Sequence, residues 1–507
     1  MASTTGITIV ATFFIIVFSL LILRGFLPSQ RTADEKVSNV PEPTIVSTLL
    51  SAALHESVIL PGSFAFTKAT NSYWAKQESE VIPACVVRPR TTKELSVTVK
   101  ILKQEYDKDP RGMFAVRSGG HSPVPNAASM QGGVLIDLSL FNEVTPSEDR
   151  SSVTIGAGNR WKDVSTVLDK IGLAVVGGRN SNVGVGGLTL GVCSNVISFE
   201  IVLASGTVTT ASELVNYDLW NALKGGSNNF GIVTSFRVRA FPSTNVWSGF
   251  LYLPNSQSSK VVAAFHEFVG RTDTYDKYTA GPIACFTYVQ PLGLQVVSVN
   301  LVYTKPEKWP ACWKSSGFAS LWRFWSTCKV QSLTSATDEL NGLNPPGRRQ
   351  VLAATTIKND LPTLIAAHAI YRDSIEALRG IKGLSWTFVM QPILPEWVKI
   401  GSPNPMGLDT DEALVIVSFT VNWEKDRDDE FVNMMTRNAV EEIEAVAARN
   451  GTGNRYRYLN YCAKFQKPFE GYGEENWRFL KETSRKYDPE GLFQRGCTGG
   501  FKLGMGE

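Results

Sequence analysis

The segment FAVRSGGHSP (residues 114–123) runs from a short apolar stretch into two glycines and a histidine. Glycines that follow a strand let the backbone approach an anionic group closely, with free N–H groups directed at it. The segment therefore predicts a site for a phosphate-containing cofactor. The imidazole of His121 would then be at hand to hydrogen-bond to that cofactor, or to bond covalently to an electrophilic carbon of it. A glycine turn beside a surface histidine is the alternative explanation of these residues alone.

A second glycine-rich segment, LAVVGGRNSNVGVGGLTLG, covers residues 173–191. Glycines alternate there with small and branched residues in a pattern that ordinary helices and strands tolerate poorly. We expect an irregular wall packed against a flat ligand, with a loop at the rim of a sheet as the alternative. A Rossmann dinucleotide site is not indicated, because no G-x-G-x-x-G lies between a strand and a helix with an acidic residue following.

Around these segments, strand-like and helix-like patterns alternate, which predicts an α+β protein. A chain of 507 residues exceeds what one hydrophobic core usually organises, so two domains are expected. The first would cover residues 72–242, after a proline-containing linker over 28–71. The second, over 243–449, would be a sheet with helices against one face. Residues 450–507 could close the second domain or return to the first, and we expect them to return to the first and complete its cofactor site.

The overall composition is that of an ordinary globular protein, with 43% hydrophobic and 19% charged residues. The 50 Lys and Arg residues are scattered and nearly balanced by 47 Asp and Glu residues, which argues against nucleic acid as a partner. Seven cysteines without a CxxC pair or a Cys/His cluster predict neither a disulfide framework nor a metal site.

The first residues of the chain are its clearest compositional anomaly. Residues 6–23 carry no charge and are followed by Arg24, and 18 residues are just enough to cross a bilayer core of roughly 30 Å. We expect residues 1–27 to be a single membrane anchor, with a cleaved secretion signal as the alternative. Both place the body of the protein in a lumen or outside the cell. The glycosylation sequon at Asn450 is compatible with that route.

A third segment, RYRYLNYCAKFQ (residues 455–466), is rich in tyrosine. If it forms a strand, alternation puts Tyr456 and Tyr458 on one face and Tyr461 on the other. All three tyrosines could equally be core or interface residues whose hydroxyl groups are satisfied, and we expect this of Tyr456.

Taken together, the segments resemble the berberine bridge enzyme-like group of the vanillyl-alcohol oxidase, or PCMH-type, FAD enzymes, and in particular its fungal secondary-metabolism members. The resemblance covers residues 72–507. The matching segments, in order, are SYWAKQESEVIPACVVRPRTTKEL (72–95), FAVRSGGHSP (114–123), GGVLIDLS (132–139), GGRNSNVGVGGLTLG (177–191), NYDLWNALKGGSNNFGIVTSFRVR (216–239), RYLNYC (457–462) and YDPEGLFQRGCTGGFKL (487–503).

The resemblance implies that FAD is held covalently by His121. Relatives with a second covalent bond carry a cysteine where this chain has Asn180, so a single attachment is expected. A valine directly before the G-x-G-G glycines goes with oxygen access in relatives, and Val183 therefore favours an oxidase that uses O2. The remaining residues expected at the cofactor are Arg117, Ser118, Gly119, Gly120, Ser122, Gly184, Gly186, Gly187 and Asn460.

The resemblance also makes Tyr461 the leading candidate for the catalytic base. An ordinary tyrosine hydroxyl titrates near pH 10, so a nearby cation or hydrogen-bond donors must stabilise the phenolate. Lys464 is close in sequence, although a strand would not guarantee contact. Relatives often carry an acidic residue where this chain has Ala463, which puts the local electrostatics in doubt. Gln391, near the end of a predicted strand, is a weaker candidate for a polar catalytic group.

The expected function is two-electron oxidation of a small organic compound, in particular a natural product, by hydride transfer to the flavin. Two alternatives remain. An oligosaccharide oxidase would need an open aromatic groove, to which WPACWKSSGFASLWRFW (residues 309–325) could contribute. A catalytically impaired protein is the other, because the chain passes from Gly191 to Cys193 without about a dozen residues that relatives carry in the flavin-facing loop.

Overall fold

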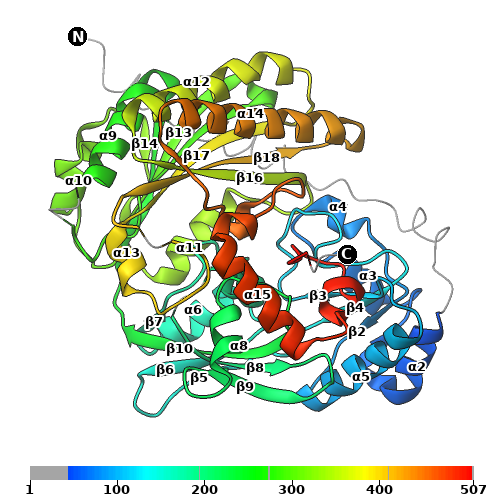
Figure 1. Ribbon diagram of the computed structural model, residues 1–507. Helices are drawn as coiled ribbons and strands as arrows, with labels where there is room; N and C mark the ends of the chain where they lie inside the picture. The colour runs from blue at the N-terminus through cyan, green and yellow to red at the C-terminus, as the bar shows by residue number, and fades with distance from the viewer. Residues whose placement is uncertain (1–43, 193–194, 272–274, 409, 505–507) are drawn as a thin grey trace, which may run out of the picture.

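The computed structural model describes residues 44–192, 195–271, 275–408 and 410–504. They form two sheet-based units that lie one above the other in Figure 1, with a long segment of the chain's end crossing between them. The predicted α+β class with two domains is confirmed.

The lower unit in Figure 1 contains a four-stranded and a six-stranded sheet. In the first, β2, β4 and β3 run parallel and β1 is antiparallel to β2. The second is antiparallel, with β7 also pairing with β10. The strands, in sheet order, are β1 (Val58–Ile59), β2 (Cys85–Val87), β4 (Val134–Asp137) and β3 (Phe114–Arg117), then β5 (Val144–Pro146), β6 (Ser152–Gly156), β10 (Ile232–Pro242), β8 (Val196–Val202) and β9 (Val208–Ser212), with β7 (Leu173–Val175).

The helices of this unit cover its sheets and connect their strands. The longest follows Thr91, whose hydroxyl group caps the first turn by accepting a hydrogen bond of 3.2 Å from the Glu94 nitrogen. Besides three helices near the two ends of the chain that are described below, this unit contains α5 (Thr92–Lys108), α6 (Trp161–Asp169), α7 (Val185–Val192) and α8 (Tyr217–Ala222), with the short α4 (Lys76–Ser79).

The prediction of a linker over residues 28–71 is wrong for its described part. Residues 44–71 form α2 (Ile45–Ala53), β1 and α3 (Phe64–Thr70), and β1 pairs with β2. Leu50 and Phe66 are buried in this unit, so the segment belongs to the fold. These elements were not predicted, because helices of about two turns are too short to show a clear hydrophobic periodicity in the sequence.

The predicted anchor at residues 1–27 lies outside the described residues. Within the part of the chain that the structure describes, no helix is long and apolar enough to cross a membrane. At the sequon, the Asn450 side-chain nitrogen donates a 3.0 Å hydrogen bond to Thr363, and Thr452 is buried.

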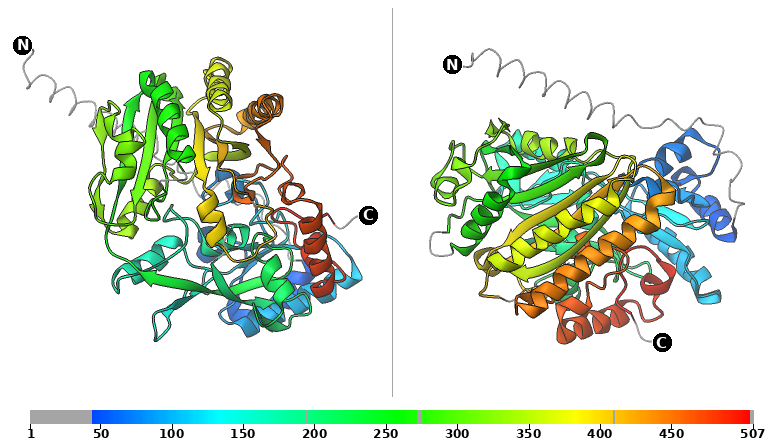
Figure 2. Two further views of the ribbon diagram at one scale, coloured as in Figure 1. Left: turned by 60° about the vertical axis from the view of Figure 1, so that its left-hand side comes forward. Right: turned by 90° about the horizontal axis from the view of Figure 1, so that it is seen from above.

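The upper unit is built on a nine-stranded antiparallel sheet. The helices α9 (Ser258–Gly270), α12 (Leu361–Leu378) and α14 (Asp429–Arg449) cover its outer face, as Figure 2 shows from two sides. In sheet order the strands are β14 (Trp325–Ser326), β11 (Val246–Pro254), β13 (Leu294–Tyr303), β12 (Ile283–Val289), β17 (Ser385–Ile393), β18 (Leu414–Trp423), β16 (Arg349–Lys358) and β19 (Gly453–Asn454), with β15 (Lys329–Gln331) on β11. Shorter helices are α10 (Ala311–Ser315), α11 (Leu333–Gly342) and α13 (Pro395–Ile400).

Alternation along these strands separates a helix-covered face from a face that looks toward the lower unit. In β12 and β17, the large side chains of Phe286, Trp386 and Phe388 are buried under the helices. Their neighbours Thr287 and Thr387 point to the other side and line a cavity between the units.

The chain's end contacts both units, although residues 450–507 were expected to join the lower unit alone. β19 pairs with β16 of the upper sheet. The 3₁₀ turn η8 (Leu459–Tyr461), the helix α15 (Glu474–Tyr487) and the π-helical turn η10 (Leu492–Gly496) then return to the lower unit. There Phe493 is fully buried, and the Tyr472 hydroxyl group donates a 3.0 Å hydrogen bond to the Gly225 carbonyl oxygen.

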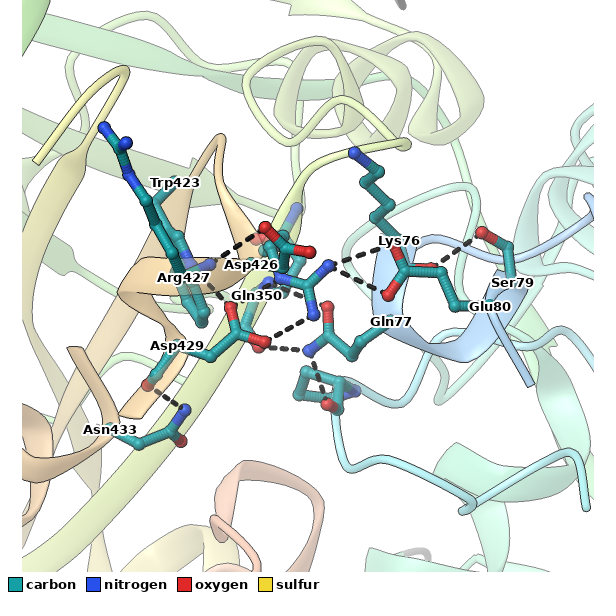
Figure 3. Close-up of polar contacts among 12 residues, drawn as sticks. Lys76, Gln77, Ser79, Glu80, Gln350, Trp423, Asp426, Arg427, Asp429 and Asn433 are labelled. Atoms are coloured by element: carbon teal, nitrogen blue, oxygen red, sulfur yellow. Dashed lines mark hydrogen bonds and ion pairs between the residues drawn. The ribbon is translucent and has the colours of Figure 1, made fainter. Parts of the chain in front are cut away.

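A polar seam ties the two units together beside α4. Figure 3 shows the carboxylates of Glu80, from the lower unit, and Asp429, from the upper unit, pointing toward each other. Between them lies Arg349, which is 5% exposed and pairs with both, at 2.9 Å from Glu80. Gln77 and Gln350 add two hydrogen bonds, of 2.6 Å and 3.2 Å, between the side chain of the first and the backbone of the second. The seam therefore fixes α4 against β16.

Candidate active site

The two glycine-rich segments predicted separately from the sequence lie in contact. A Cβ atom at Gly184 would come within 2.4 Å of the Gly119 nitrogen, so neither position has room for a side chain. The Ser118 hydroxyl group bridges the segments, because it accepts a hydrogen bond of 3.1 Å from the Gly186 nitrogen and donates one of 2.6 Å to the Ala157 carbonyl oxygen. At Gly187, by contrast, a Cβ atom would meet nothing within 4 Å, and this residue lines the cavity.

The prediction of an irregular wall over residues 173–191 is only partly correct. Residues 176–184 are a loop, but Val185–Val192 form the helix α7. A Cβ atom at Gly191 would lie 2.3 Å from Asn460 Oδ1, so this position has no room for a side chain, and at Gly186 it would make a tight contact of 3.0 Å with Ser118 Cβ. Close packing thus outweighs the low helix propensity of glycine.

His121 is held by a stacked tryptophan. The rings of His121 and Trp74 lie 4.4 Å apart at an interplanar angle of 9°. Trp74 is itself fixed to the upper unit, since its indole nitrogen donates a 3.1 Å hydrogen bond to the Asn344 carbonyl oxygen. The Nε2 atom of His121 is buried without a hydrogen-bond partner. Burial, with a smaller effect of the Arg160 guanidinium group, lowers the pKa of His121 to about 4, so the ring is neutral near pH 7.

Arg117 does not take the place predicted for it at the cofactor. Its side chain points away from the cavity, pairs with Asp137 at 3.0 Å and donates a 2.6 Å hydrogen bond to the Ala69 carbonyl oxygen. The guanidinium group also lies over the Tyr73 ring, 4.7 Å from its centre. Alternation along β3 directs Arg117 into the lower unit, so it supports the loop from beneath.

The segment that carries Tyr461 is not the predicted strand. Residues 459–461 form a 3₁₀ turn, and the Tyr458 and Tyr461 rings meet edge to face with centres 4.5 Å apart. The prediction that they occupy opposite faces is therefore wrong. Both tyrosines line the cavity, whereas Lys464 lies exposed at the surface.

The cation beside Tyr461 is Arg179, a residue that the sequence analysis missed. Its Nη2 atom donates hydrogen bonds to the Tyr461 hydroxyl oxygen and, at 2.8 Å, to Gln391 Oε1. Burial acts to lower the pKa of Arg179, but contact with Tyr461 outweighs it and the pKa is raised, so the group stays charged. Arg179 is the one cation inside the glycine-rich segment 173–191, and that position was the available signal.

The other predicted catalytic and cofactor positions surround this group. The Gln391 side-chain oxygen Oε1 lies 3.5 Å from the Tyr461 hydroxyl oxygen. Asn460 donates a 3.2 Å hydrogen bond to the Leu188 carbonyl oxygen of α7, which locks the tyrosine turn to the glycine-rich helix. The predicted cofactor residues that line the cavity are Ser118, Gly119, Gly120, His121, Ser122, Asn180, Val183, Gly184, Gly186, Gly187 and Asn460.

The cavity between the units has a volume of about 1410 Å³. Ligand sites usually measure roughly 300–1,000 Å³, so this one has room for a cofactor together with a substrate. One wall consists of the glycine-rich segments and the other of the inner face of the upper sheet. The tryptophans of residues 309–325 do not line it, so the expectation that they shape a substrate groove is wrong. Trp313 is buried in the upper core instead, and Trp322 is exposed on the surface.

The residues present fit a flavin. The wall at Gly187 is open enough for a flat ring to approach the backbone, and the orphaned Nε2 atom of His121 borders the same space. A neutral imidazole nitrogen without a partner can hydrogen-bond or attack an electrophilic carbon. His121, the loop around Gly119 and the helix α7 would hold such a cofactor against the lower unit.

Comparisons with known proteins agree with this geometry. A family model described as an FAD binding domain matches residues 83–212. The FAD-dependent monooxygenase sdcF of Emericella nidulans is 32% identical over 483 residues, which cover 90% of this chain and 99% of that protein. The FAD-dependent monooxygenase drtC of Aspergillus calidoustus is 30% identical over 475 residues, 90% of each chain.

Solved structures share the fold at lower identity. Berberine bridge enzyme from Eschscholzia californica superposes with a TM-score of 0.70 at 13% identity, covering 90% of this chain and 99% of that one. A chitooligosaccharide oxidase has a TM-score of 0.68 at 19% identity, with coverage of 90% and 99%.

Proposed function

Because the chain belongs to the berberine bridge enzyme-like family of FAD-dependent oxidoreductases, we propose that it oxidises a small organic natural product by two electrons at the cavity between its units. A bound FAD would accept the two electrons as a hydride and pass them to O2. The observation that carries the proposal is the contact of Arg179 with Tyr461 inside a cavity lined by the two glycine-rich segments.

In this proposal Tyr461 removes the proton from the substrate hydroxyl group. Arg179 donates a hydrogen bond to the Tyr461 hydroxyl oxygen and would stabilise negative charge that develops around it while the proton is transferred. Gln391 orients the pair, because its side-chain oxygen Oε1 accepts the hydrogen bond from Arg179 and lies within reach of the Tyr461 hydroxyl group. The C–H bond that breaks must then face the glycine-lined wall.

We also propose that FAD is attached covalently through His121 alone. The orphaned Nε2 atom and the low pKa of His121 support a ring that is available as a nucleophile. Asn180 lines the cavity but carries no group that would form a second bond.

Acid precipitation of the purified protein tests the cofactor and its attachment together. Wild-type protein should give a yellow pellet and an intact mass raised by one flavin, and His121→Ala should give a white pellet with no added mass. A yellow His121→Ala pellet would place the bond elsewhere. Wild-type protein without any flavin would support the catalytically impaired alternative, in which the short connection after Gly191 prevents FAD binding.

O2 as the electron acceptor is part of the proposal. Val183 lines the cavity next to the contact between Gly119 and Gly184, and its small side chain is compatible with oxygen access. The curated relatives named above are called monooxygenases, so two outcomes must be separated. Release of one H2O2 per substrate identifies an oxidase, whereas incorporation of labelled oxygen from O2 into the product identifies a monooxygenase.

Oligosaccharide oxidation is the less favoured alternative. It rests on likeness of fold to a chitooligosaccharide oxidase at 19% identity, and the tryptophan-rich segment lies away from the cavity. Oxygen uptake with chitooligosaccharides or xylooligosaccharides at rates typical of enzymes would reverse this preference.

We propose, from the sequence alone, that the segment at residues 6–23 takes the body to a lumen or the exterior. Carbonate extraction of membranes from expressing cells tests it: an anchored protein stays in the pellet, and a secreted one is found in the medium.

A further inference from the structure

Three threonines form a row across the inner face of the upper sheet. Thr287 of β12 is paired with Thr387 of β17, which is paired in turn with Thr420 of β18. All three residues line the cavity. The residues at the two ends of this threonine row, Val296 of β13 and Leu352 of β16, line the cavity too and are apolar. The row is therefore a short polar patch with an apolar border on each side.

The hydroxyl groups of the threonine row have unused hydrogen-bonding capacity. Thr287 Oγ1 and Thr387 Oγ1 lie 3.1 Å apart, so one of them donates to the other. Because each hydroxyl group can donate once and accept twice, this bond leaves one O–H group and most of the acceptor capacity free. Within the described part of the chain, neither side chain has another hydrogen-bond partner, and the Thr420 side chain has none. A substrate that displaces water from the row must satisfy these groups or leave them at a cost.

The sheet itself does not require hydroxyl groups at these positions. Threonine and valine both favour strands, because both side chains branch at Cβ. On the same face, each of the three strands carries an apolar branched residue at another position: Val289 on β12, Val389 on β17 and Ile416 on β18. The fold thus accepts such residues on this face of each strand, so the alignment of three hydroxyl groups at one level points to a ligand.

The threonine row lies at a distance from the proposed site of reaction. Gln391, which contacts Arg179 and lies beside Tyr461, is on the same strand as Thr387. Four residues separate them along β17, about 13 Å at a rise of roughly 3.3 Å per residue. One molecule can therefore contact Tyr461 and the row together only if it is elongated.

We propose that the threonine row binds a second oxygen atom of the substrate, a neutral hydroxyl or carbonyl group remote from the alcohol that is oxidised beside Tyr461. This rests on the proposed function and narrows its substrate class to elongated compounds with an oxygen group towards each end. The threonine hydroxyl groups both donate and accept, so they can bond to either kind of oxygen. The apolar border at Val296 and Leu352 offers no partners to the several hydroxyl groups of a sugar ring.

Two rigid probes of the same shape test the proposal on the flavin-loaded protein near neutral pH. These are 4′-hydroxy-4-biphenylmethanol and 4′-methyl-4-biphenylmethanol, titrated while the flavin absorbance is followed. We expect the hydroxyl probe to bind about fivefold more tightly or better, as the net gain from one neutral hydrogen bond predicts. Equal binding of the two probes would overturn the proposal, as would a failure of both to bind.

A double variant checks that the threonine row is the cause. Thr287→Val with Thr387→Val removes both hydroxyl groups of the bonded pair and keeps the shape of the wall. The preference for the hydroxyl probe should fall below about twofold, while the affinity for the methyl probe stays unchanged. A preference that persists would overturn the proposal. An equal loss of affinity for both probes would overturn it as well, because the threonines would then only shape the wall.

Thr356→Val is the matched control. Thr356 lies on β16 of the same sheet but outside the cavity wall, and its Oγ1 atom is buried without a hydrogen-bond partner. This variant should keep the preference of the wild type, and a preference lost here as in the double variant would contradict the proposal. Protein that holds no flavin would contradict the proposed function, whereas flavin-loaded protein without the expected preference contradicts only the role of the threonine row.

Discussion

At the scale of single residues, Arg179 explains how a tyrosine could act as a base in this cavity. The sequence analysis required a cation near Tyr461 and considered Lys464, which is two positions past Cys462 but lies exposed. The true neighbour is 282 residues away in the chain and reaches Tyr461 only because the loop after β7 and the turn η8 meet at the same wall. Such a contact between distant segments carries no signature in local spacing.

Replacement of Arg179 tests this role. Arg179→Met removes the cation and hydrogen-bond donor from Tyr461, so we expect kcat to fall by about 10²-fold or more. The measurement is kcat at saturating substrate and equal flavin content. Arg179→Lys, which keeps the charge, should retain more activity. An unchanged kcat in Arg179→Met would show that Arg179 does not assist the step at Tyr461.

The environment of His121 predicts how flavin attachment depends on pH. Burial lowers the pKa of His121 to about 4, so the imidazole keeps its free electron pair at any pH well above 4. An ordinary histidine would lose it as pH falls through about 6.5. When FAD is added to protein produced without riboflavin, the rate of attachment should stay constant from pH 8 to pH 5.5, measured as acid-stable flavin. A rate that halves near pH 6.5 would contradict a buried neutral ring.

At the scale of elements, the pattern of strands and helices over residues 243–449 predicted the arrangement of the upper unit. The expected sheet with helices against one face matches the upper sheet, whose outer face α9, α12 and α14 cover. The failures are short or packed elements. Residues 459–461 form a single turn that alternation cannot distinguish from a strand, and α7 is a helix because its glycines allow close contact with the loop at Gly119. In both cases tertiary contacts decided the conformation.

Alanine substitution at Gly184, just before α7, and at Gly187, within α7, should change the stability of the protein in opposite directions. Gly184→Ala forces a methyl group into the Gly119 backbone, so we expect a loss of about 3 kcal/mol or more and little bound flavin. Gly187→Ala meets no atom and improves helix propensity, which should raise stability by about 0.5–1 kcal/mol while its methyl group impairs FAD binding. Thermal unfolding and flavin content measure the two effects. Equal unfolding temperatures for both variants would refute the described contact between the segments.

At the scale of the whole molecule, the two-domain α+β arrangement followed from the sequence, but the way its halves are joined did not. The seam around Arg349 combines residues from α4, β16 and α14, and no local pattern marks Glu80 or Asp429 as partners of one arginine. The return of the chain's end to the lower unit was expected, but the pairing of β19 with β16 of the upper sheet was not. Contacts between segments that are far apart in the sequence determine how the two units are joined, and the local spacing of residues does not reveal such contacts.

Arg349 should therefore contribute measurably to stability. Arg349→Met leaves Glu80 and Asp429 without their shared cation, and we expect the free energy of unfolding to fall by about 3 kcal/mol, since the arginine is nearly buried. Lys358→Met is the matched control, because it breaks an exposed pair with Glu412 and should cost less than about 1 kcal/mol. Denaturant unfolding gives both values. Similar losses in the two variants would mean that the seam behaves as an ordinary surface ion pair.

The return of residues 455–503 to the lower unit also has a consequence for the order of events during translation. Ribosomes add roughly 5–20 residues per second and domains usually fold as they emerge. Here the early half cannot finish folding when it leaves the exit tunnel, because Phe493 fills its core and Asn460 braces its glycine helix. A nascent chain stalled at residue 450 would hold an unfinished pocket. The protein thus becomes able to bind FAD only after the last tenth of the chain has been synthesised.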